Sequence, residues 1–242
     1  MAHIRNKNFI SGATGNLIFR NLNGKQIVQS HPGEIRQTQA TVESASEFSH
    51  CSRWAKHLRI GLHSFLAGHT DSYMYRRLTG AFYNALLENT HLPKGQRTPF
   101  TADMKALEGF EFNTHSPFKK YFLPEITVVM DSQRQVQVTV PELEPKSQMR
   151  FPEGVPHAEL VVYACATKFE ASSPITDAFF TLPIPLDAAV QCETVWTSPA
   201  LPEGYFVVVA AKLLYYEENQ FMGKKYSNSD LLNPCRILFC GI

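Results

Sequence analysis

The chain has 242 residues, of which 44% are apolar and 19% are charged, and its formal net charge is +1. This composition excludes collagen-like, low-complexity and disordered proteins, and a chain this long buries enough surface to fold without a metal or disulfide. It contains no apolar run long enough to span a membrane, and its opening residues, MAHIRNKNFISGATG, lack the apolar segment of a secretory signal. We therefore expect a cytoplasmic protein.

The cysteines are expected to be free thiols. Their number is odd, the chain has no export signal, and a core of this size forms unaided, so a reducing compartment is the simplest setting. Cys235 and Cys240 are expected to point to opposite faces of an extended segment, which disfavours both a zinc half-site and a local disulfide. The full set is Cys51, Cys165, Cys192, Cys235 and Cys240.

Positive and negative charges are distributed unevenly along the chain. Residues 1–110 contain 13 Lys and Arg against 7 Asp and Glu, whereas residues 111–242 contain 10 against 15. A basic half either meets nucleic acid or an anionic surface, or docks on an acidic half within one chain or between neighbours in an assembly. The chain has no block of five like charges, which favours docking between halves.

The first expected element is a β-hairpin over residues 16–30. Apolar residues lie on both sides of Asn23-Gly24, a pair that suits a type I′ turn because both central residues need positive φ. The GATG segment at 12–15 precedes a strand rather than a helix and lacks the Gly-Lys-Ser/Thr ending of a phosphate-binding loop. No nucleotide site is therefore expected there.

Two helices are expected next, over residues 42–66 and 71–88, with a loop at 91–99. Thr41 is the expected N-cap of the first helix, Gly68 ends it, and Thr70 or Asp71 caps the second. The short connection makes the two helices antiparallel neighbours. The expected buried stripes are Val42, Ala45, Phe48, Cys51, Trp54, Ala55, Leu58, Leu62 and Phe65, and then Tyr73, Met74, Leu78, Ala81, Phe82, Ala85 and Leu86.

After a short helical or turn segment near 101–108, the hydrophobic period changes from 3.6 to 2. Strands are expected near 126–130, 136–140, 158–169, 176–184, 190–196, 205–217 and 235–241. Short strands separated by Pro- and Gly-rich turns indicate an antiparallel sandwich, and helices followed by strands argue against a parallel sheet.

The expected fold class is therefore α+β. Residues 1–110 are expected to contain the β-hairpin and the antiparallel helical hairpin. Residues 111–242 are expected to form an immunoglobulin- or fibronectin-III-like antiparallel β-sandwich, with Trp196 in the core between its sheets.

No catalytic motif is found in the chain. The G-x-S-x-G, H-E-x-x-H, D-x-D-x-D-G and C-x-x-C patterns are all missing. Glu47 and His50 have the spacing of half a di-iron ligand set, but the second helix offers no matching pair, so two solvated polar residues are expected. We therefore expect a protein that is not an enzyme and has no cofactor, metal site or small-molecule substrate.

The polar side of the first helix, together with two arginines of the second, is the expected interaction surface. A nucleic-acid interface would interleave aromatic residues with these charges or form a recognisable groove-reading module, and the sequence indicates neither. A solvated face that contacts a neighbouring protein is the favoured interpretation. The residues are His50, Arg53, Lys56, His57, Arg59, Arg76 and Arg77.

Aromatic residues are crowded in the last part of the chain. Sandwich proteins that bind sugars use exposed rings as stacking platforms, whereas strand aromatics more often fill the core and pair across strands. The core is the favoured location here, and a hairpin tip is expected at residues 221–230. The aromatic residues are Tyr205, Tyr215, Tyr216, Phe221 and Tyr226.

Distinctive short motifs are spread over nearly the full length of the chain. They begin with Ser11-Gly12 and Gly15-Asn16-Leu17, continue through LEGFEFN (107–113) and HAEL (157–160), and end with KYSNS (225–229). Together they resemble a family of small uncharacterised proteins common in Bacteroidota. The resemblance implies a source group and an architecture, and it implies no activity and no site residue.

The expected function is that of a structural or protein-interaction subunit of a larger assembly, of which a virion or phage-like particle is one setting. A two-stranded hairpin is marginal in isolation, so it must pair with the sandwich or with another chain. Two alternatives stay open: a nucleic-acid-associated protein that uses the basic helical half, and a carbohydrate-binding module. No membrane partner is expected.

Overall fold

The computed structural model describes residues 2–5, 9–22, 25–31, 37–170 and 175–242. The chain divides into two compact units, Met1–Val42 and Glu43–Ile242, and the expected boundary after residue 110 lies inside the second unit. Helices and antiparallel sheets together form the protein, which confirms the expected mixture of α and β structure. No helix in the described part of the chain is both long and apolar enough to cross a lipid bilayer.

The first unit is a four-stranded antiparallel sheet whose strands follow one another in sequence order. The expected hairpin at 16–30 is confirmed as its last two strands, in which Leu22 lies opposite Lys25. The turn at Asn23-Gly24 lies outside the described residues. The sequence pattern does not predict the other two strands. The four are β1 (His3–Arg5), β2 (Phe9–Thr14), β3 (Leu17–Leu22) and β4 (Lys25–Ser30).

The expected helix at 42–66 is divided into α1 (Gln39–Gly61) and α2 (His63–Leu66), and the expected helix at 71–88 is α3 (Met74–Glu88). Thr38, rather than Thr41, supplies the side chain at the start of α1: its Oγ1 accepts the backbone N–H of Thr41 at 3.3 Å. Before α3, Oδ1 of Asp71 accepts the backbone N–H of Tyr73 at 3.0 Å, at the place where an acidic cap is expected.

A buried carboxylate of α1 holds the loop at residues 91–99. Glu47 is 1% exposed, so the expectation that it is solvated is wrong. Its Oε1 lies 3.8 Å from Nε of Arg97 and accepts the backbone N–H of Gly95 at 3.3 Å. The loop thus covers this part of the helix, whereas His50 is exposed, as expected.

Two antiparallel sheets form the β part of the second unit. Their strands are β5 (Thr127–Met130), β6 (Val136–Val140), β7 (His157–Thr167), β8 (Thr176–Pro185), β9 (Thr194–Thr197), β10 (Phe206–Asn219), β11 (Gly223–Tyr226) and β12 (Cys235–Gly241). In the first sheet, β8 pairs with β7 and β7 pairs with β10, while β11 and β12 both pair with the other edge of β10. In the second sheet, the order is β5-β6-β9.

Three short helices lie in the connections between these elements. They are η1 (Lys105–Leu107), α4 (Phe118–Tyr121) and α5 (Pro145–Gln148). The η1 helix falls in the segment near 101–108 for which a helix or turn is expected. The β10–β11 hairpin turns at residues 220–222, so the expected tip at 221–230 overlaps this turn only at its start, and residues 223–226 of it form β11.

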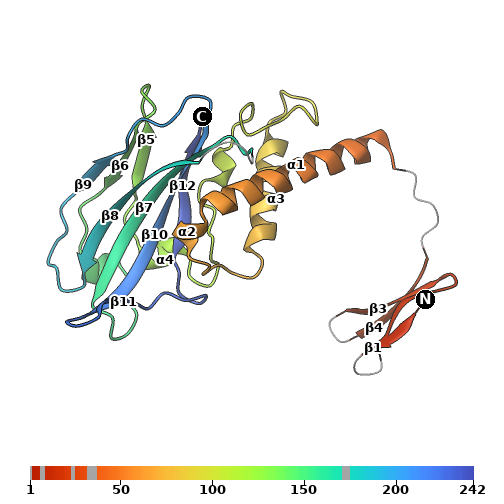
Figure 1. Ribbon diagram of the computed structural model, residues 1–242, viewed down its shortest axis with the longest axis horizontal. Helices are drawn as coiled ribbons and strands as arrows, with labels where there is room; N and C mark the ends of the chain where they lie inside the picture. The colour runs from red at the N-terminus through yellow and green to blue at the C-terminus, as the bar shows by residue number, and fades with distance from the viewer. Residues whose placement is uncertain (1, 6–8, 23–24, 32–36, 171–174) are drawn as a thin grey trace. The chain divides into compact units, whose positions relative to one another are not determined.

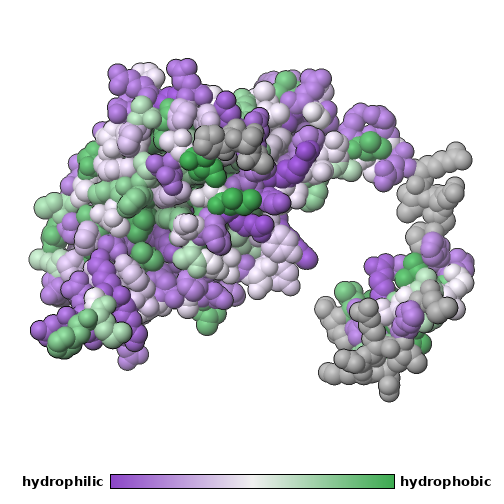
Figure 2. Space-filling model, viewed as in Figure 1, coloured by the Kyte–Doolittle hydropathy of each residue, from purple (hydrophilic) through white to green (hydrophobic). Residues whose placement is uncertain are grey.

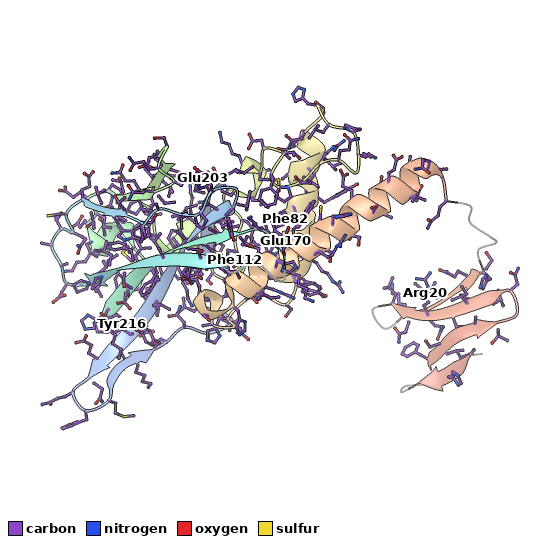
Figure 3. The ribbon with its side chains drawn as sticks, turned by 45° about the horizontal axis from the view of Figure 1, so that its top comes forward. Arg20, Phe82, Phe112, Glu170, Glu203 and Tyr216 are labelled. Atoms are coloured by element: carbon purple, nitrogen blue, oxygen red, sulfur yellow. The ribbon has the colours of Figure 1, made fainter. Side chains whose placement is uncertain are left out.

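The second unit has three layers, which Figure 1 shows as helices, a five-stranded sheet and a three-stranded sheet. One hydrophobic cluster, which includes the labelled Phe82 and Phe112 of Figure 3, joins the helices to residues such as Val208 of β10. A second cluster joins Val138 of β6 to Val207 of β10. Because strand side chains alternate, adjacent residues of β10 face different layers, and the middle of the central sheet is buried on both faces.

The edges of these clusters contain half-buried aromatic residues. Trp196 of β9, which is expected in the core between the sheets, is half-buried and stacks on Phe180 of β8 with ring centroids 5.9 Å apart. It therefore covers the rim of the second cluster rather than its centre.

The segment LEGFEFN (107–113) lies along the edge of β12. The backbone N–H of Gly109 donates to the carbonyl of Ile237 at 2.8 Å, and the backbone N–H of Ile237 donates to the carbonyl of Phe110 at 3.0 Å. Gly109 has a φ of +85°, and a Cβ at this position would lie 2.9 Å from the Arg236 guanidinium. Glycine is therefore favoured where this segment joins the helices to the central sheet.

A β-bulge in β12 decides which face its cysteines occupy. Val209 pairs with Phe239 and Ala210 with Ile237, so Leu238 is the extra residue. Cys235 and Cys240 consequently belong to the same helix-side cluster, and the expectation that they point to opposite faces is wrong. The five cysteines are free thiols, as expected, and four of them are buried.

Two phenylalanines test the assignment of the helical core. Phe82 of α3 is 0% exposed and Phe48 of α1 is 48% exposed. We expect Phe82→Ala to lower the free energy of unfolding by about 3–5 kcal/mol, because truncation of a fully buried ring leaves a cavity. Phe48→Ala, the matched control, should lower it by less than about 1 kcal/mol. Urea unfolding measures both, and equal effects would contradict the assignment.

Candidate functional site

The basic residues of α1 gather around a shallow depression on its exposed side. Arg53, Lys56 and Arg59 line this depression of about 180 Å³, and Tyr75 of α3 lies on its other side. His50 contacts Arg53, with Nδ1 3.1 Å from the guanidinium, and His57 is half-buried. The structure thus brings together much of the expected interaction surface.

The two arginines of α3 have different environments. Arg76 is exposed and donates to the Tyr75 hydroxyl at 2.9 Å. Arg77 is half-buried: it pairs with Asp71, donates to the carbonyl of Glu111 at 2.8 Å and lies over the Phe110 ring. Arg77 therefore connects α3 with the LEGFEFN segment inside the unit and is not part of the depression.

Two tyrosines beside this surface are missed by the sequence pattern. Tyr73 is expected in the buried stripe of the second helix but is 63% exposed, and Tyr75 is 46% exposed. The Arg76 guanidinium lies 5.6 Å and 5.5 Å from the centroids of their rings. The helical surface therefore combines cations with exposed aromatic rings, an arrangement that suits stacking on a planar partner.

The aromatic residues of the last strands divide into core and tip. Tyr215 and Tyr216 are 0% and 4% exposed, which confirms the core location expected for them. At the β10–β11 tip, Phe221 and Met222 are 90% and 85% exposed. Figure 2 shows this tip as a green projection at the lower left, where β11 lies in Figure 1.

The sheet of the first unit has one uncharged and one charged face. Strand alternation and register place Arg20 and Lys25 together on the charged face. None of the described strand positions on the other face carries a charge. Among the strand residues whose side chains are described, the large apolar ones on this uncharged face are Ile10, Leu17, Phe19 and Val28.

Within the first unit, the residues whose burial is described form no hydrophobic core on either face of this sheet. Among the residues of Met1–Val42 whose burial is described, none is buried, and Leu17 and Val28 are 46% and 51% exposed. The sequence of this unit carries five Lys and Arg against one Glu, a net charge of +4. The rest of the chain carries 18 Lys and Arg against 21 Asp and Glu, a net charge of −3.

A larger pocket lies between α2 and the central sheet. Its volume is about 430 Å³, and a lysine of β10, Lys212, lines it although only 3% of this residue is exposed. The ammonium donates to the carbonyl of Phe65 in α2 at 2.9 Å, which caps the end of this short helix. The other lining residues are Ser64, Ala67, His69, Val161, Leu214, Tyr226 and Asn228.

Burial lowers the pKa of Lys212 below its ordinary value near 10.5, because the charged form loses its hydration. The neighbouring thiol of Cys235, which faces Lys212 across the β10–β12 pair, opposes this effect. Among the described residues, no carboxylate forms an ion pair with Lys212. The ammonium is therefore a buried cation whose present partner is a neutral carbonyl.

In the part of the chain that the structure describes, no three His, Cys, Asp or Glu side chains come together as a metal site. No protein-family model matches this chain, and no significant match is found among curated proteins or solved structures. The resemblance to proteins of Bacteroidota therefore stays a prediction.

Replacement of the buried lysine tests its electrostatic state. We expect Lys212→Met to raise the free energy of unfolding at pH 7 by about 1 kcal/mol, because methionine fills a similar volume without a buried charge. Between the pKa of Lys212 in the folded chain and 10.5, the unfolded chain binds more protons than the folded chain. The free energy of unfolding of the wild type therefore rises with pH over this range. The advantage of the variant is therefore greatest at neutral pH and shrinks toward pH 10.5.

Urea unfolding of both proteins over this pH range measures the difference. Lys168→Met is the matched control, since Lys168 is exposed and its replacement should change the free energy of unfolding little. A variant that is less stable than the wild type at pH 7 would contradict the prediction.

Proposed function

We propose that this protein is a non-enzymatic assembly subunit whose first unit binds a second copy of the chain. One observation carries the proposal: the sheet of Met1–Val42 has an uncharged face of exposed apolar side chains and no buried residue among those whose burial is described. A small sheet that is exposed on both faces is marginal in water. A protein surface that covers the apolar face removes this area from water and stabilises the sheet.

Charge complementarity supports a second copy as the partner. The first unit has a net charge of +4, and the remainder of the chain has a net charge of −3. The first unit of one copy is therefore attracted to the second unit of another copy. A head-to-tail contact of this kind leaves one surface of each type open at the ends. It therefore continues into a ring or a longer array, as a subunit of a virion or phage-like particle requires.

We also propose that residues 111–242 form an immunoglobulin- or fibronectin-III-like sandwich. The support is the distribution of strands, with β11 counted as an extension of the β10 hairpin. The first, second and fifth strands form one sheet, and the third, fourth, sixth and seventh form the other. Constant-type immunoglobulin sandwiches divide their strands in the same way, except that their fourth strand belongs to the first sheet. Such domains commonly act through their surfaces in protein–protein contacts.

Nucleic-acid binding by the helical surface is a second candidate function. The observation that favours it is the contact of Arg76 with the exposed rings of Tyr73 and Tyr75, beside the cations of α1. Surfaces that bind single strands combine cations with rings on which bases stack. The carbohydrate-binding alternative has less support, since Tyr215 and Tyr216 are buried.

The assembly proposal predicts that the uncharged face of the first unit drives self-association. We expect the apparent mass of the full-length chain to rise with concentration in static light scattering at low salt. Leu17→Glu should weaken this association at least about tenfold, since it places a charge in the apolar contact. High salt should weaken it as well, because the units carry opposite charges.

Leu22→Glu provides the matched control for this experiment. Leu22 lies on the charged face of the same strand and is 59% exposed, compared with 46% for Leu17. The control should associate like the wild type. A chain that is monomeric at every concentration, or two variants with equal effects, would contradict the proposal.

The nucleic-acid alternative predicts a steep response to salt. If the helical surface binds phosphates, retention on single-stranded DNA should fall by orders of magnitude between ~50 and ~200 mM salt. The double variant Arg53→Gln, Lys56→Gln should weaken retention and reduce this slope. A flat salt response would remove this alternative while leaving the assembly proposal in place.

A further inference from the structure

The pocket beside Lys212 has a charged floor and largely apolar walls. Lys212 and Phe65 are 3% and 9% exposed, and Val161 and Leu214 are half-buried beside them. Ser64 and Ala67 are exposed at the end of α2, and Tyr226 is 47% exposed on β11, so these residues form the rim. The pocket is therefore open to solvent at its rim and desolvated at its base.

The base of this pocket has unused hydrogen-bonding capacity. A lysine ammonium has three N–H donors, and the described contact of Lys212 uses one of them, for the carbonyl of Phe65. Two other polar groups of the lining are engaged elsewhere: His69 pairs with Asp230 at 3.0 Å, and the Asn228 amide donates to the carbonyl of Leu213. Among the described residues, none supplies a negative charge to this ammonium.

A buried cation without a counter-charge is unfavourable, and a ligand that carries one negative charge relieves it. We propose that this pocket binds a small amphipathic monocarboxylate, whose carboxylate pairs with Lys212 and whose apolar chain lies against Phe65, Val161 and Leu214. The volume of about 430 Å³ falls within the range of about 300–1,000 Å³ that is usual for small-molecule sites.

The lining also distinguishes a carboxylate from a phosphate. A phosphate carries a charge near −2 and is usually bound by several donors, such as arginines or a row of backbone N–H groups. The described lining offers one lysine and no arginine. A single ammonium with apolar walls matches one negative charge attached to a hydrocarbon.

The site is independent of the proposed assembly contact, since it uses residues of α2, β7, β10 and the β11 region. Strand register explains how distant residues meet there. Val161 of β7 lies opposite Lys212, which therefore points to the same face of the sheet, and α2 contributes Phe65 from the layer above. Failure of either proposal leaves the other standing.

Decanoate is a suitable probe for this site. We expect a titration of the ¹⁵N-labelled full-length chain to shift backbone amide signals around Phe65, Val161 and Leu214, with a Kd below about 1 mM. Methyl decanoate has the same chain without the charge and should bind at least about tenfold more weakly. Binding of decanoate should also weaken as the pH rises toward 10, because Lys212 loses its proton while the carboxylate keeps its charge.

Two variants and a control complete the test. Lys212→Met should weaken decanoate binding at least tenfold and abolish its preference over the methyl ester. Ser64→Trp, which places a large ring at the exposed rim, should weaken both ligands. Lys168→Met, an exposed lysine that does not line the pocket, should change neither.

Specific outcomes would overturn the proposal. These are no saturable shift below about 1 mM decanoate, shifts confined to another part of the chain, or equal binding of the acid and its ester by the wild type. The comparison of the two ligands and the pH series use the wild-type chain alone. They decide the matter even if a variant fails to fold.

Discussion

The structure of the second unit depends on burial of both faces of its two central strands. In β7 and β10, successive side chains enter different hydrophobic clusters, one shared with the helices and one shared with the three-stranded sheet. Removal of either outer layer would expose one side of these strands to water. The helices are therefore part of the same folding unit as the sheets, and the LEGFEFN segment with Arg77 connects the two inside that unit.

The sequence predicted most individual elements, but it did not predict how they pack. Periodicity located the helices and most strands of the second unit, and Asn-Gly located the hairpin of the first. The runs at 158–167 and 206–216 are apolar at almost every position rather than at alternate ones. Such runs are typical of strands that are covered on both faces. A sandwich leaves one face of each sheet in water, so the sandwich interpretation overlooked this signal. The continuous apolar runs predict that the helices pack on the outer face of the sheet.

The candidate sites were harder to predict, because their partners are distant in sequence. The basic cluster of α1 follows from helical spacing, and Arg53, Lys56 and Arg59 do lie together. Tyr73 fits a buried stripe by spacing and is nevertheless exposed at the start of α3. Lys212 interrupts the apolar run of β10, and this interruption is the feature of the sequence that points to the pocket. Its significance depends on Phe65, 147 residues earlier, whose carbonyl receives its hydrogen bond.

The extra residue in β12 has a consequence for how this chain tolerates insertions and deletions. Leu238 shifts the phase of the strand by one, so everything after it projects to the side opposite that of a regular strand. Loss of Leu238 would remove the bulge and leave Cys235 and Cys240 four positions apart in a regular strand, so both would still face the helices. The bulge thus lets β12 contain one residue more than its pairing needs, and the face that each cysteine occupies would survive the loss of that residue.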